Sequence, residues 1–567
     1  MKEVMDIPVK IDNSAHDWAA SMLSSLSLKE KIGQLIHMAA WSNRGAAHDE
    51  QLLKTIQEYG VGGVIFFQGD PERQAVLTNA CQEVSKVPVM ISIDGEWGLG
   101  MRLDGVEAFP YQMTLGAVAD PSLIEEMGRL VGRQMRRLGV NLNHAPVIDV
   151  NTNPANPVIN FRSFGQQVEA VQERATAYMK GMQSEQVLAC AKHFPGHGDT
   201  AVDSHLALPV LDKSLAELKA TELQPFAHLF REGVGAVMTG HLQVTVLQND
   251  KRASSLAKEI VHTLLQEQMG FKGLVVTDAL DMKAVADHFP PGGAEVEAFL
   301  AGNDVLLFVR DVAVTVEAML QAVKDGRIAE ESIDKRVYKQ LLFKYWMGLS
   351  SYESVDLENI VEEVNTGISE LNEKLFAASI TCPKRELADG QALEALFSFF
   401  GEGEQVEQGA LAHHTTTKGS ERSQKMPVFD AGWMAAYPQC QRFECRFAGS
   451  SAPFTMPEIK EGAEVMLAIH DVRLKAPGNF GLNDQLLNAV RALVSKYRVH
   501  LVFFGNAYAL GSLPELEQCA SIMLAYQENH YTQKYMLEAL QGHISMHGRL
   551  PVDVASWSAG SGLSINH

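Results

Sequence analysis

Cysteine and long apolar runs are both scarce in this sequence, and their absence excludes two classes of protein. Six cysteines are scattered over 567 residues and form no CxxC pair, so a disulfide framework is not expected. No stretch approaches the roughly 20 apolar residues of a membrane helix, and residues 1–18 lack the apolar core of a signal peptide. We therefore expect no membrane insertion and a cytoplasmic protein, or a periplasmic one if a leader was removed from this chain.

Positive charge is also in deficit. Lys and Arg number 48 against 69 Asp and Glu, which gives a formal net charge of −21. This sign repels phosphate backbones and anionic lipid. We therefore expect no nucleic-acid partner, whereas the oligomeric state is left open by the sequence.

Eight short apolar runs alternate with helical patterns over the first 310 residues. They begin at Ile32, Val61, Val87, Val140, Val187, Val234, Gly273 and Asn303. Near-continuous apolar strands that alternate with helices predict a parallel sheet covered on both faces. Eight such units in about 300 residues suit a closed barrel better than an open sheet. We therefore predict an α/β fold with a (β/α)8 TIM-type barrel over residues 1–335.

The remaining residues form a second alternating pattern. Residues 336–380 are helical and charged, which predicts a connecting arm. Beyond them, apolar runs beginning at Val465, Val499 and Ser521 alternate with helical stretches. This pattern predicts a smaller α/β sandwich domain over residues 381–567, whose purpose the sequence does not reveal.

Several of the predicted barrel strands end in a polar residue. These strand-end residues are Asp94, Asp149, His193, His241 and Asp278. In a barrel, the carboxyl ends of the strands converge on one mouth, where active sites are found. We therefore expect residues that are far apart in the sequence to meet there.

The densest group of polar residues is the motif KHFPGHGDTAVDSH, which begins at Lys192. Its proline and glycines predict a loop and not a helix. A metal site with His193, His197 and His205, a purely structural loop, and catalysis or sugar binding are all compatible with it. The Pro-Gly interruption disfavours the metal site. The spacing of Asp203 and His205 favours catalysis, because a carboxylate so close can orient an imidazole for proton transfer.

Two further motifs follow barrel strands. In VVTDALDMKAV, Asp278 is either the N-cap of a helix or a catalytic carboxylate, and the residues alone leave both open. In ISIDGEWGLGMRL, Asp94 and Arg102 are candidate sugar contacts, together with Trp97. Glu96 in the same motif is equally compatible with a solvated surface charge.

The motif NPVINFRSFG begins at Asn156. Arg162 lies between Phe161 and Phe164, which are able to anchor the loop while the guanidinium donates hydrogen bonds to hydroxyl groups. A surface arginine is the alternative.

Taken together and in this order, KHFPGHGDT with its following DSH, RSFG, VMTGH and TDAL resemble glycoside hydrolase family three, and in particular its bacterial β-N-acetylglucosaminidases of peptidoglycan recycling. The resemblance is strong over roughly residues 20–310 and reduces to a general outline over 380–567. It implies a retaining exo-β-N-acetylglucosaminidase that removes non-reducing-end GlcNAc by double displacement. Muropeptides and chitin-type oligosaccharides are the implied substrates, and no metal or organic cofactor is required.

The resemblance also implies a role for each matching residue. Asp278 matches the nucleophile, and His205, oriented by Asp203, matches the acid/base. The sugar is implied to be held by Asp94, Arg162, Lys192 and His193, with Arg102 nearby, whereas His241 and Asp199 support the barrel mouth.

Two departures from the family pattern bear on these expectations. One-domain relatives usually carry a DQEGG-type motif where this chain has DGEWGLGMR, so the pocket wall differs. Members that act on glucosides commonly take their acid/base from the second domain, and the DSH motif argues against that need here. A β-N-acetylglucosaminide phosphorylase and a β-glucosidase remain alternatives, as does a sugar-binding protein without catalysis.

Overall fold

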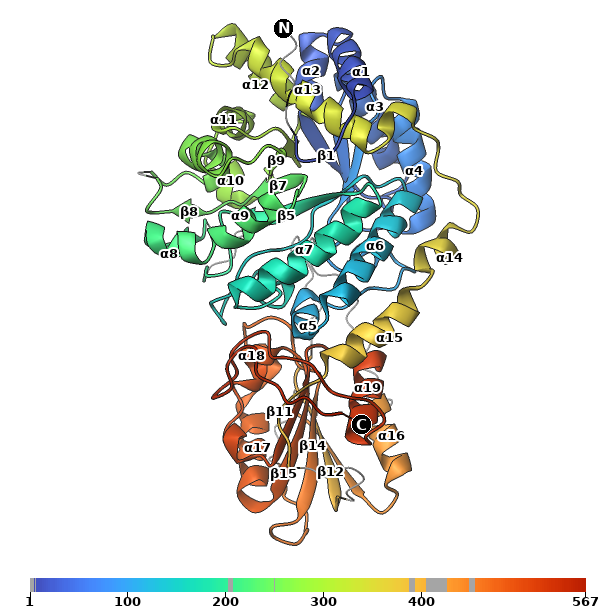
Figure 1. The fold of residues 1–567 in the computed structure, drawn as a ribbon, viewed down its shortest axis with the longest axis vertical. Coiled ribbons are helices and arrows are strands. Elements are labelled where there is room, and N and C mark those ends of the chain that lie inside the picture. Colours follow the sequence, from blue (N-terminus) through green and yellow to red (C-terminus); the bar gives the residue numbers. More distant parts are fainter. Residues whose placement is uncertain are drawn as a thin grey trace. The chain divides into compact units, whose positions relative to one another are not determined.

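The computed structural model describes residues 5, 7–201, 208–248, 250–386, 393–403, 426–447 and 454–566. These residues form two compact units (Figure 1). The first, called the barrel unit, comprises Met1–Phe109, Ile124–Asp149 and Ala175–Ile368. The second unit comprises Pro110–Leu123, Val150–Arg174 and Ser369–His567. Within the described ranges, no helix is long and apolar enough to cross a membrane.

Eight parallel strands form the sheet of the barrel unit, in the order β10-β1-β2-β3-β4-β5-β7-β9. Their bounds are β1 Ile36–Ala40, β2 Gly63–Phe66, β3 Met90–Ile93, β4 Leu142–Asn143, β5 Leu188–Phe194, β7 Ala236–Thr239, β9 Leu274–Thr277 and β10 Leu306–Leu307. The two ends of this order also join, because Thr277 N donates to Val305 O at 3.1 Å and Val276 bridges to Val305. Each predicted run contains or directly precedes one of these strands, so the predicted barrel is confirmed.

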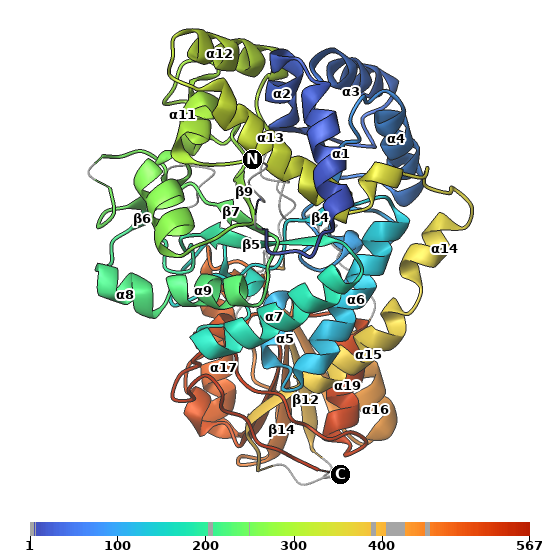
Figure 2. The ribbon, with the colours of Figure 1, turned by 45° about the horizontal axis from the view of Figure 1, so that its top comes forward.

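Helices surround the barrel strands (Figure 2). They are α1 Asn13–Ser24, α2 Leu28–Gln34, α3 Ala46–Tyr59, α4 Pro71–Glu83, α6 Pro121–Arg137, α7 Val168–Ser184, α8 Leu215–Ala220, α9 Leu223–Arg231, the π-helix η4 Glu259–Gln268, α10 Lys283–Ala286, α11 Gly293–Ala301, α12 Val312–Lys324 and α13 Glu330–Trp346. Because helices cover the outer face and side chains fill the interior, β2, β3, β7 and β9 are buried along their whole length. Side chains begin several helices in the expected way; Asp70, for example, caps α4 by accepting from Arg73 N.

The predicted arm over 336–380 contains the end of α13 and two further helices. These are α14 Ile360–Asn365 and α15 Ile368–Ser379. The boundary between the two compact units falls at the start of α15.

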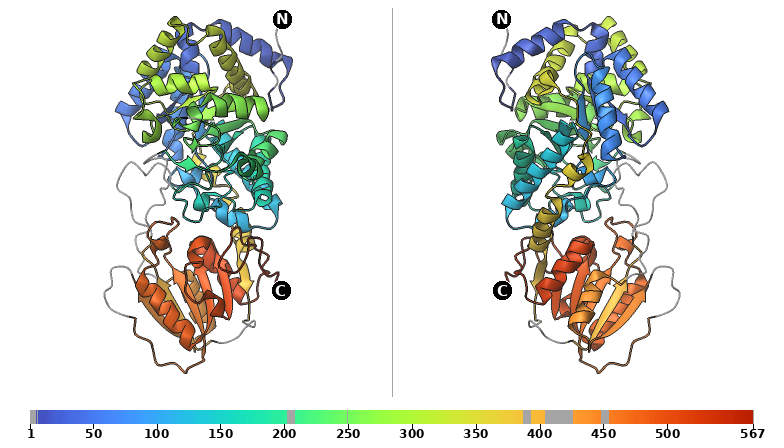
Figure 3. Two further views of the ribbon diagram at one scale, coloured as in Figure 1. Left: turned by 90° about the vertical axis from the view of Figure 1, so that its left-hand side faces the viewer. Right: turned by 90° about the vertical axis from the view of Figure 1, so that its right-hand side faces the viewer.

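The second unit contains a six-stranded sheet in the order β11-β16-β15-β14-β12-β13, in which only β11 is antiparallel to its neighbour. The strands are β11 Thr381–Lys384, β12 Ala395–Phe400, β13 Gln441–Arg446, β14 Glu464–His470, β15 Arg498–Phe504 and β16 Ser521–Ala525. The orange and red strands lie side by side in both views of Figure 3. The smaller α/β domain that the sequence predicts is therefore confirmed.

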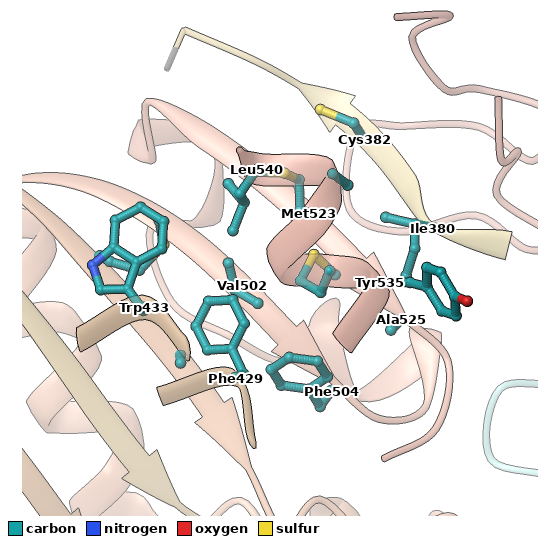
Figure 4. Close-up of a cluster of buried hydrophobic side chains, with 14 of the residues drawn as sticks. Ile380, Cys382, Phe429, Trp433, Val502, Phe504, Met523, Ala525, Tyr535 and Leu540 are labelled. Carbon is teal, nitrogen blue, oxygen red and sulfur yellow. The ribbon is translucent and has the colours of Figure 1, made fainter. Parts of the chain in front are cut away.

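Helices lie on both faces of this second sheet. They are α16 Val428–Ala436, α17 Asp484–Lys496, α18 Ala507–Leu510 and α19 His530–Leu540. Figure 1 shows α17 on one face, with α16 and α19 on the other. A buried apolar cluster fills the second of these layers (Figure 4): Phe429 and Trp433 of α16 and Tyr535 of α19 pack with Val502 and Met523 of the sheet.

Two segments that connect barrel strands belong to the second unit. Residues 110–123 lie between β3 and β4 and contain α5 Gln112–Ala117, and residues 150–174 lie between β4 and β5 and contain the 3-10 turn η2 Asn160–Arg162. The second unit is therefore not formed from the carboxyl-terminal part of the chain alone.

Candidate active site

Four of the predicted site residues lie at the carboxyl ends of barrel strands. Asp94 follows β3, Lys192 and His193 lie near the end of β5, and Asp278 follows β9. Parallel barrel strands direct these ends to one mouth. The structure therefore brings the four residues to the same end of the barrel unit.

The buried ring of His144, which follows β4, lies at this same end of the barrel strands. Burial lowers the pKa of His144 to about 4, and the charges of Asp94, Lys192 and Asp278 also act on this pKa. Because such electrostatic effects weaken with distance, the three charged residues lie within electrostatic range of one imidazole. That imidazole is neutral at pH 7, and sequence reasoning missed it.

Asp94, Glu96, Arg102 and Lys192 form a buried cluster, which we call the charge quartet. The Nζ atom of Lys192 lies 2.8 Å from Asp94 Oδ1 and 2.8 Å from Glu96 Oε1. Arg102 Nη2 lies 3.0 Å from Asp94 Oδ2, and Arg102 Nε donates to the Asp94 backbone oxygen at 3.2 Å. Two carboxylates and two cations balance in charge, which is how buried ions are tolerated.

The quartet corrects one expectation and supports another. Glu96 is fully buried, so the expectation of a solvated surface charge is wrong; its charge is compensated by Lys192. Asp94 retains the largest side-chain exposure of the four, at 9%. It is therefore the member best placed to meet a ligand, and the balanced charges suit a neutral one.

His193 is held by the buried carboxylate of Asp149. His193 Nδ1 lies 2.7 Å from Asp149 Oδ2, and the backbone N of His193 donates to Asp149 Oδ1 at 3.1 Å. The backbone N of His197 donates to the same Oδ1 at 2.8 Å. One side chain thus fixes both the ring of His193 and the backbone at the start of the histidine loop.

The ionisation of Asp149 sets the tautomer of His193. Burial alone would raise the pKa of Asp149, but the charge and hydrogen bond of His193 and the amide of His197 outweigh it and lower that pKa. An ionised carboxylate only accepts hydrogen bonds, so Nδ1 of His193 carries the proton that it shares with Asp149. Nε2 is then the ring atom that is available to a ligand.

Asp278 lies directly after β9 and is half-buried. Its backbone N donates to Thr239 O at 2.9 Å, and its Oδ1 accepts from Ala279 N at 2.8 Å. The next helix, α10, has Met282 at its N-cap position. The helix-cap alternative for Asp278 is therefore wrong, and the accessible strand-end carboxylate remains.

His241 supports the segment that carries Asp278. Its Nε2 bonds the backbone oxygen of Ala279 at 2.9 Å, and its Nδ1 bonds Ser255 Oγ at 2.7 Å. A carbonyl only accepts, so Nε2 carries the proton and Nδ1 accepts from the serine. This arrangement fits the supporting role that the family resemblance implies for His241.

Asp199 also has a supporting contact. Lys213 Nζ lies 3.2 Å from Asp199 Oδ2 and 2.6 Å from Glu222 Oε1. Lys213 thereby ties Asp199 of the histidine loop to the start of α9.

Three predicted site residues are not brought into this arrangement. Asp203 and His205 lie outside the described residues, so their assignment as the acid/base pair stays a prediction. Arg162 lies on η2 in the second unit. Phe161 and Phe164 are buried on either side of it, as expected for anchors of this loop.

His205, one of the three histidines of the metal-site alternative, lies outside the described residues. Among the residues that are described, no three or more His, Cys, Asp or Glu side chains are grouped in a way that holds a metal ion.

Sequence reasoning noted Asp149 as a strand-end residue but gave it no role. The signal was its position at the end of an apolar run, which it shares with Asp94 and Asp278. Glu96 carried no such signal, because a glutamate two residues beyond a strand resembles an ordinary loop charge.

Residues 27–341 match the family described as Glycosyl hydrolase family 3 N terminal domain. Beta-hexosaminidase A of Pseudoalteromonas piscicida is 36% identical over 281 residues; the match covers 45% of this chain and about half of that relative, 47%. The Beta-N-acetylglucosaminidase/beta-glucosidase of Cellulomonas fimi is 25% identical and covers 98% of both chains. Among solved structures, a glycoside hydrolase family 3 beta-N-acetylglucosaminidase from Paenibacillus sp. str. FPU-7 is 29% identical, with a TM-score of 0.77 over 93% of this chain and 99% of that one. The chain therefore belongs to glycosyl hydrolase family 3, in agreement with the motifs of its sequence.

Proposed function

We propose that the protein is a retaining exo-β-N-acetylglucosaminidase that removes non-reducing-end GlcNAc from muropeptides or chitin-type oligosaccharides. The observation that carries this proposal is the placement of Asp278, a half-buried carboxylate, at the same end of the barrel strands as the charge quartet. The names of three relatives support the choice of sugar, because each includes hexosaminidase or N-acetylglucosaminidase activity.

The proposed reaction is a double displacement. In the first step, Asp278 attacks the anomeric carbon, the bond to the glycosidic oxygen breaks, and His205 gives its proton to that oxygen. In the second step, neutral His205 takes a proton from water, whose oxygen attacks the anomeric carbon and releases Asp278. Asp203 holds the ring of His205 and stabilises its imidazolium form. After the second step, Asp278 is free and His205 is protonated again, so the enzyme has returned to its starting state.

The charge quartet and His193 supply the contacts of the sugar in this proposal. Sugar hydroxyl groups are neutral, and Asp94 accepts hydrogen bonds from them while Lys192 and Arg102 keep its charge compensated. His193 meets a hydroxyl through Nε2, because Nδ1 is engaged by Asp149. Arg162 is the further donor that the family resemblance implies.

A second activity is favoured by one observation. The Cellulomonas fimi relative, which matches over 98% of both chains, carries both β-N-acetylglucosaminidase and β-glucosidase in its name. We therefore propose β-glucosidase activity as the alternative or additional activity of the same site.

The test is a panel of aryl β-glycosides beside a muropeptide digest, each with and without inorganic phosphate. We expect release from the N-acetylglucosaminide, with the β-anomer as first product by NMR. Asp278→Ala should reduce turnover by more than about 10⁴-fold in a protein that still folds, because the covalent route is lost. Asp281→Ala, three residues along the same loop, is the matched control and should stay active.

Other outcomes decide against the proposal. An α-anomer as first product contradicts the double displacement, and an active Asp278→Ala variant contradicts the nucleophile. Sugar-1-phosphate formed in the presence of phosphate identifies a phosphorylase instead. Binding of all glycosides without turnover identifies a sugar-binding protein.

A further inference from the structure

Arg162 lies in a segment of the second unit that hydrogen-bonds to the carboxyl-terminal part of the same unit. The segment, residues 150–174, connects β4 to β5, and several of its hydrogen-bond partners are residues beyond 500. Tyr508, on α18, lies at its centre: the hydroxyl accepts from Asn151 Nδ2 at 2.9 Å and is 2.9 Å from the Asn151 backbone oxygen, to which it donates. Tyr508 is buried, with 8% of its surface exposed, so these bonds are sheltered from water.

Asn151, which Tyr508 holds in place, also bonds the turn that carries Arg162. Its Oδ1 accepts from the backbone N of Asn160 at 3.1 Å. Asn160 is the first residue of η2 and has a φ of 38°. Residues other than glycine rarely adopt this left-handed region, and asparagine is among those that tolerate it best.

Asn506 binds the side chain of Asn160. Its Nδ2 donates to Asn160 Oδ1 and, at 2.8 Å, to the backbone oxygen of Leu474. The other side-chain atom of Asn160, Nδ2, donates to Pro154 O at 3.0 Å. Asn160 is thus fixed through its backbone and both ends of its amide, two residues before Arg162.

The chain is fastened again just after Arg162. The backbone N of Gln166 donates to Pro551 O at 3.1 Å, and Gln166 Oε1 accepts from Asp553 N at 2.9 Å. Gly165 has a φ of 142°, and a Cβ atom on it would lie 2.3 Å from Pro551 O. Only glycine permits this close approach between the segment and the backbone at Pro551.

From these contacts we propose that the carboxyl-terminal part of the second unit sets the conformation of the Arg162 segment, with Tyr508 and Asn506 as positioning residues for sugar binding. Neither residue needs to touch the sugar. This inference rests on the proposed function, in which Arg162 donates hydrogen bonds to the sugar. It gives the second domain a role that does not require it to supply a catalytic acid.

The test compares Tyr508→Phe with Tyr526→Phe in the full chain. Tyr508→Phe removes only the hydroxyl that holds Asn151. Tyr526→Phe is matched to it, because its buried hydroxyl bonds Thr381 Oγ1 at 2.7 Å and Arg549 O at 3.4 Å, and both of these partners lie outside residues 150–174. We expect Tyr508→Phe to lower kcat/KM for an aryl N-acetylglucosaminide by about 10-fold, mainly through KM, whereas the control variant keeps the wild-type value.

A double-variant cycle separates positioning from general destabilisation. If Tyr508 acts through Arg162, Tyr508→Phe should cause no further loss in an Arg162→Ala background. A loss of the same size in both backgrounds overturns the proposal, as does an equal loss in Tyr526→Phe.

Hydrogen exchange gives a readout that does not depend on turnover. Amides of residues 156–166 should exchange faster in Tyr508→Phe than in wild type or Tyr526→Phe, because their restraint is lost. Unchanged exchange overturns the positioning role. If the wild-type protein turns over no glycoside, the proposed function fails, and faster exchange still supports the control of this segment by Tyr508.

Discussion

Nδ1 of His193 and Oδ2 of Asp149 lie 2.7 Å apart in the interior of the barrel unit. The same carboxylate accepts from the backbone of His193 and of His197. Three donors on one buried acid leave the ring little freedom to rotate or to change tautomer. His193, which directly follows Lys192 of the quartet, therefore presents Nε2 in one orientation.

Asp149→Asn should impair the enzyme without unfolding it. The amide keeps the shape of the carboxylate, but its NH2 group cannot accept, so His193 Nδ1 or one of the two backbone amides loses its partner. We expect kcat/KM for an aryl N-acetylglucosaminide to fall by about 10–100-fold, the usual effect of losing the group that orients a functional histidine.

The matched control for this variant is Asp304→Asn. Asp304 is also a buried acid of the barrel unit and accepts from Val275 N at 2.9 Å and from Lys339 Nζ at 2.8 Å. Its loss should lower the Tm but leave kcat/KM within about 3-fold of wild type. Wild-type activity in Asp149→Asn would show that the orientation of His193 is not required.

The barrel was predictable because its signals are local. A strand buried on both faces must be apolar along its length, and a helix between two such strands shows its own periodicity. The exact strand ends were not predictable in the same way. The run VNLNHAPVIDV yields only the two residues Leu142–Asn143 as strand β4, partly because Pro146 has no N–H to donate to a sheet.

The burial of Glu96 and the role of Asp149 were not predictable, because they depend on contacts between residues far apart in the sequence. Asp94 and Lys192 are separated by 98 positions, and the burial of Glu96 becomes understandable only when Lys192 is known to lie beside it. The assignment of residues 150–174 to the second unit also depends on contacts between residues far apart in the sequence. Asn151 and Tyr508 are 357 positions apart, and neither residue type signals its partner.

His205→Ala should show a dependence on the leaving group. The acid role of His205 rests on the sequence, through its spacing from Asp203. A natural disaccharide needs protonation of its departing oxygen and should lose about 10²–10⁴-fold in turnover, whereas an aryl glycoside with a good leaving group should lose much less in the first step.

His262, on η4, provides the control for this experiment, because its side chain is partly exposed (42%) on a helix of the barrel unit. His262→Ala should leave both substrates unaffected. An equal loss on both substrates in His205→Ala would contradict the role of His205 as general acid.

Lys192→Met should destabilise the protein as well as inactivate it. The variant leaves Asp94 and Glu96 buried with Arg102 as the single remaining cation of the quartet. Removing one partner of a buried ion pair costs about 3–5 kcal/mol, so the Tm of the barrel unit should fall by several degrees.

A second substitution separates the two effects of Lys192→Met. In Lys192→Met with Glu96→Gln, one uncompensated carboxylate is removed, and part of the lost Tm should return while activity does not. An unchanged Tm in Lys192→Met alone would show that Lys192 does not compensate the charges of Asp94 and Glu96.

His470, at the end of β14, makes the stability of the second unit dependent on pH. Its Nδ1 lies 2.6 Å from Glu528 Oε1, and its Nε2 lies 3.2 Å from Asp430 Oδ1. The ring is stacked between Phe400 and Phe504, at centroid distances of 5.1 Å to each. Burial would lower the pKa of His470, but the two carboxylates outweigh it and raise the pKa to about 9.

Because the pKa in the folded protein lies above the value of about 6.5 for an unfolded histidine, the imidazolium stabilises the folded state fully below pH 6.5. This contribution is lost as the pH rises through about 9 and amounts to about 3 kcal/mol. Urea unfolding followed by tryptophan fluorescence, to which the buried Trp433 of this unit contributes together with the other five tryptophans of the chain, should show decreasing stability between pH 6.5 and 9.5. His470→Gln carries no proton to lose, so its stability should be lower at pH 6.5 and nearly flat over this range. An equal slope in the variant and in wild type would assign the pH dependence to other groups.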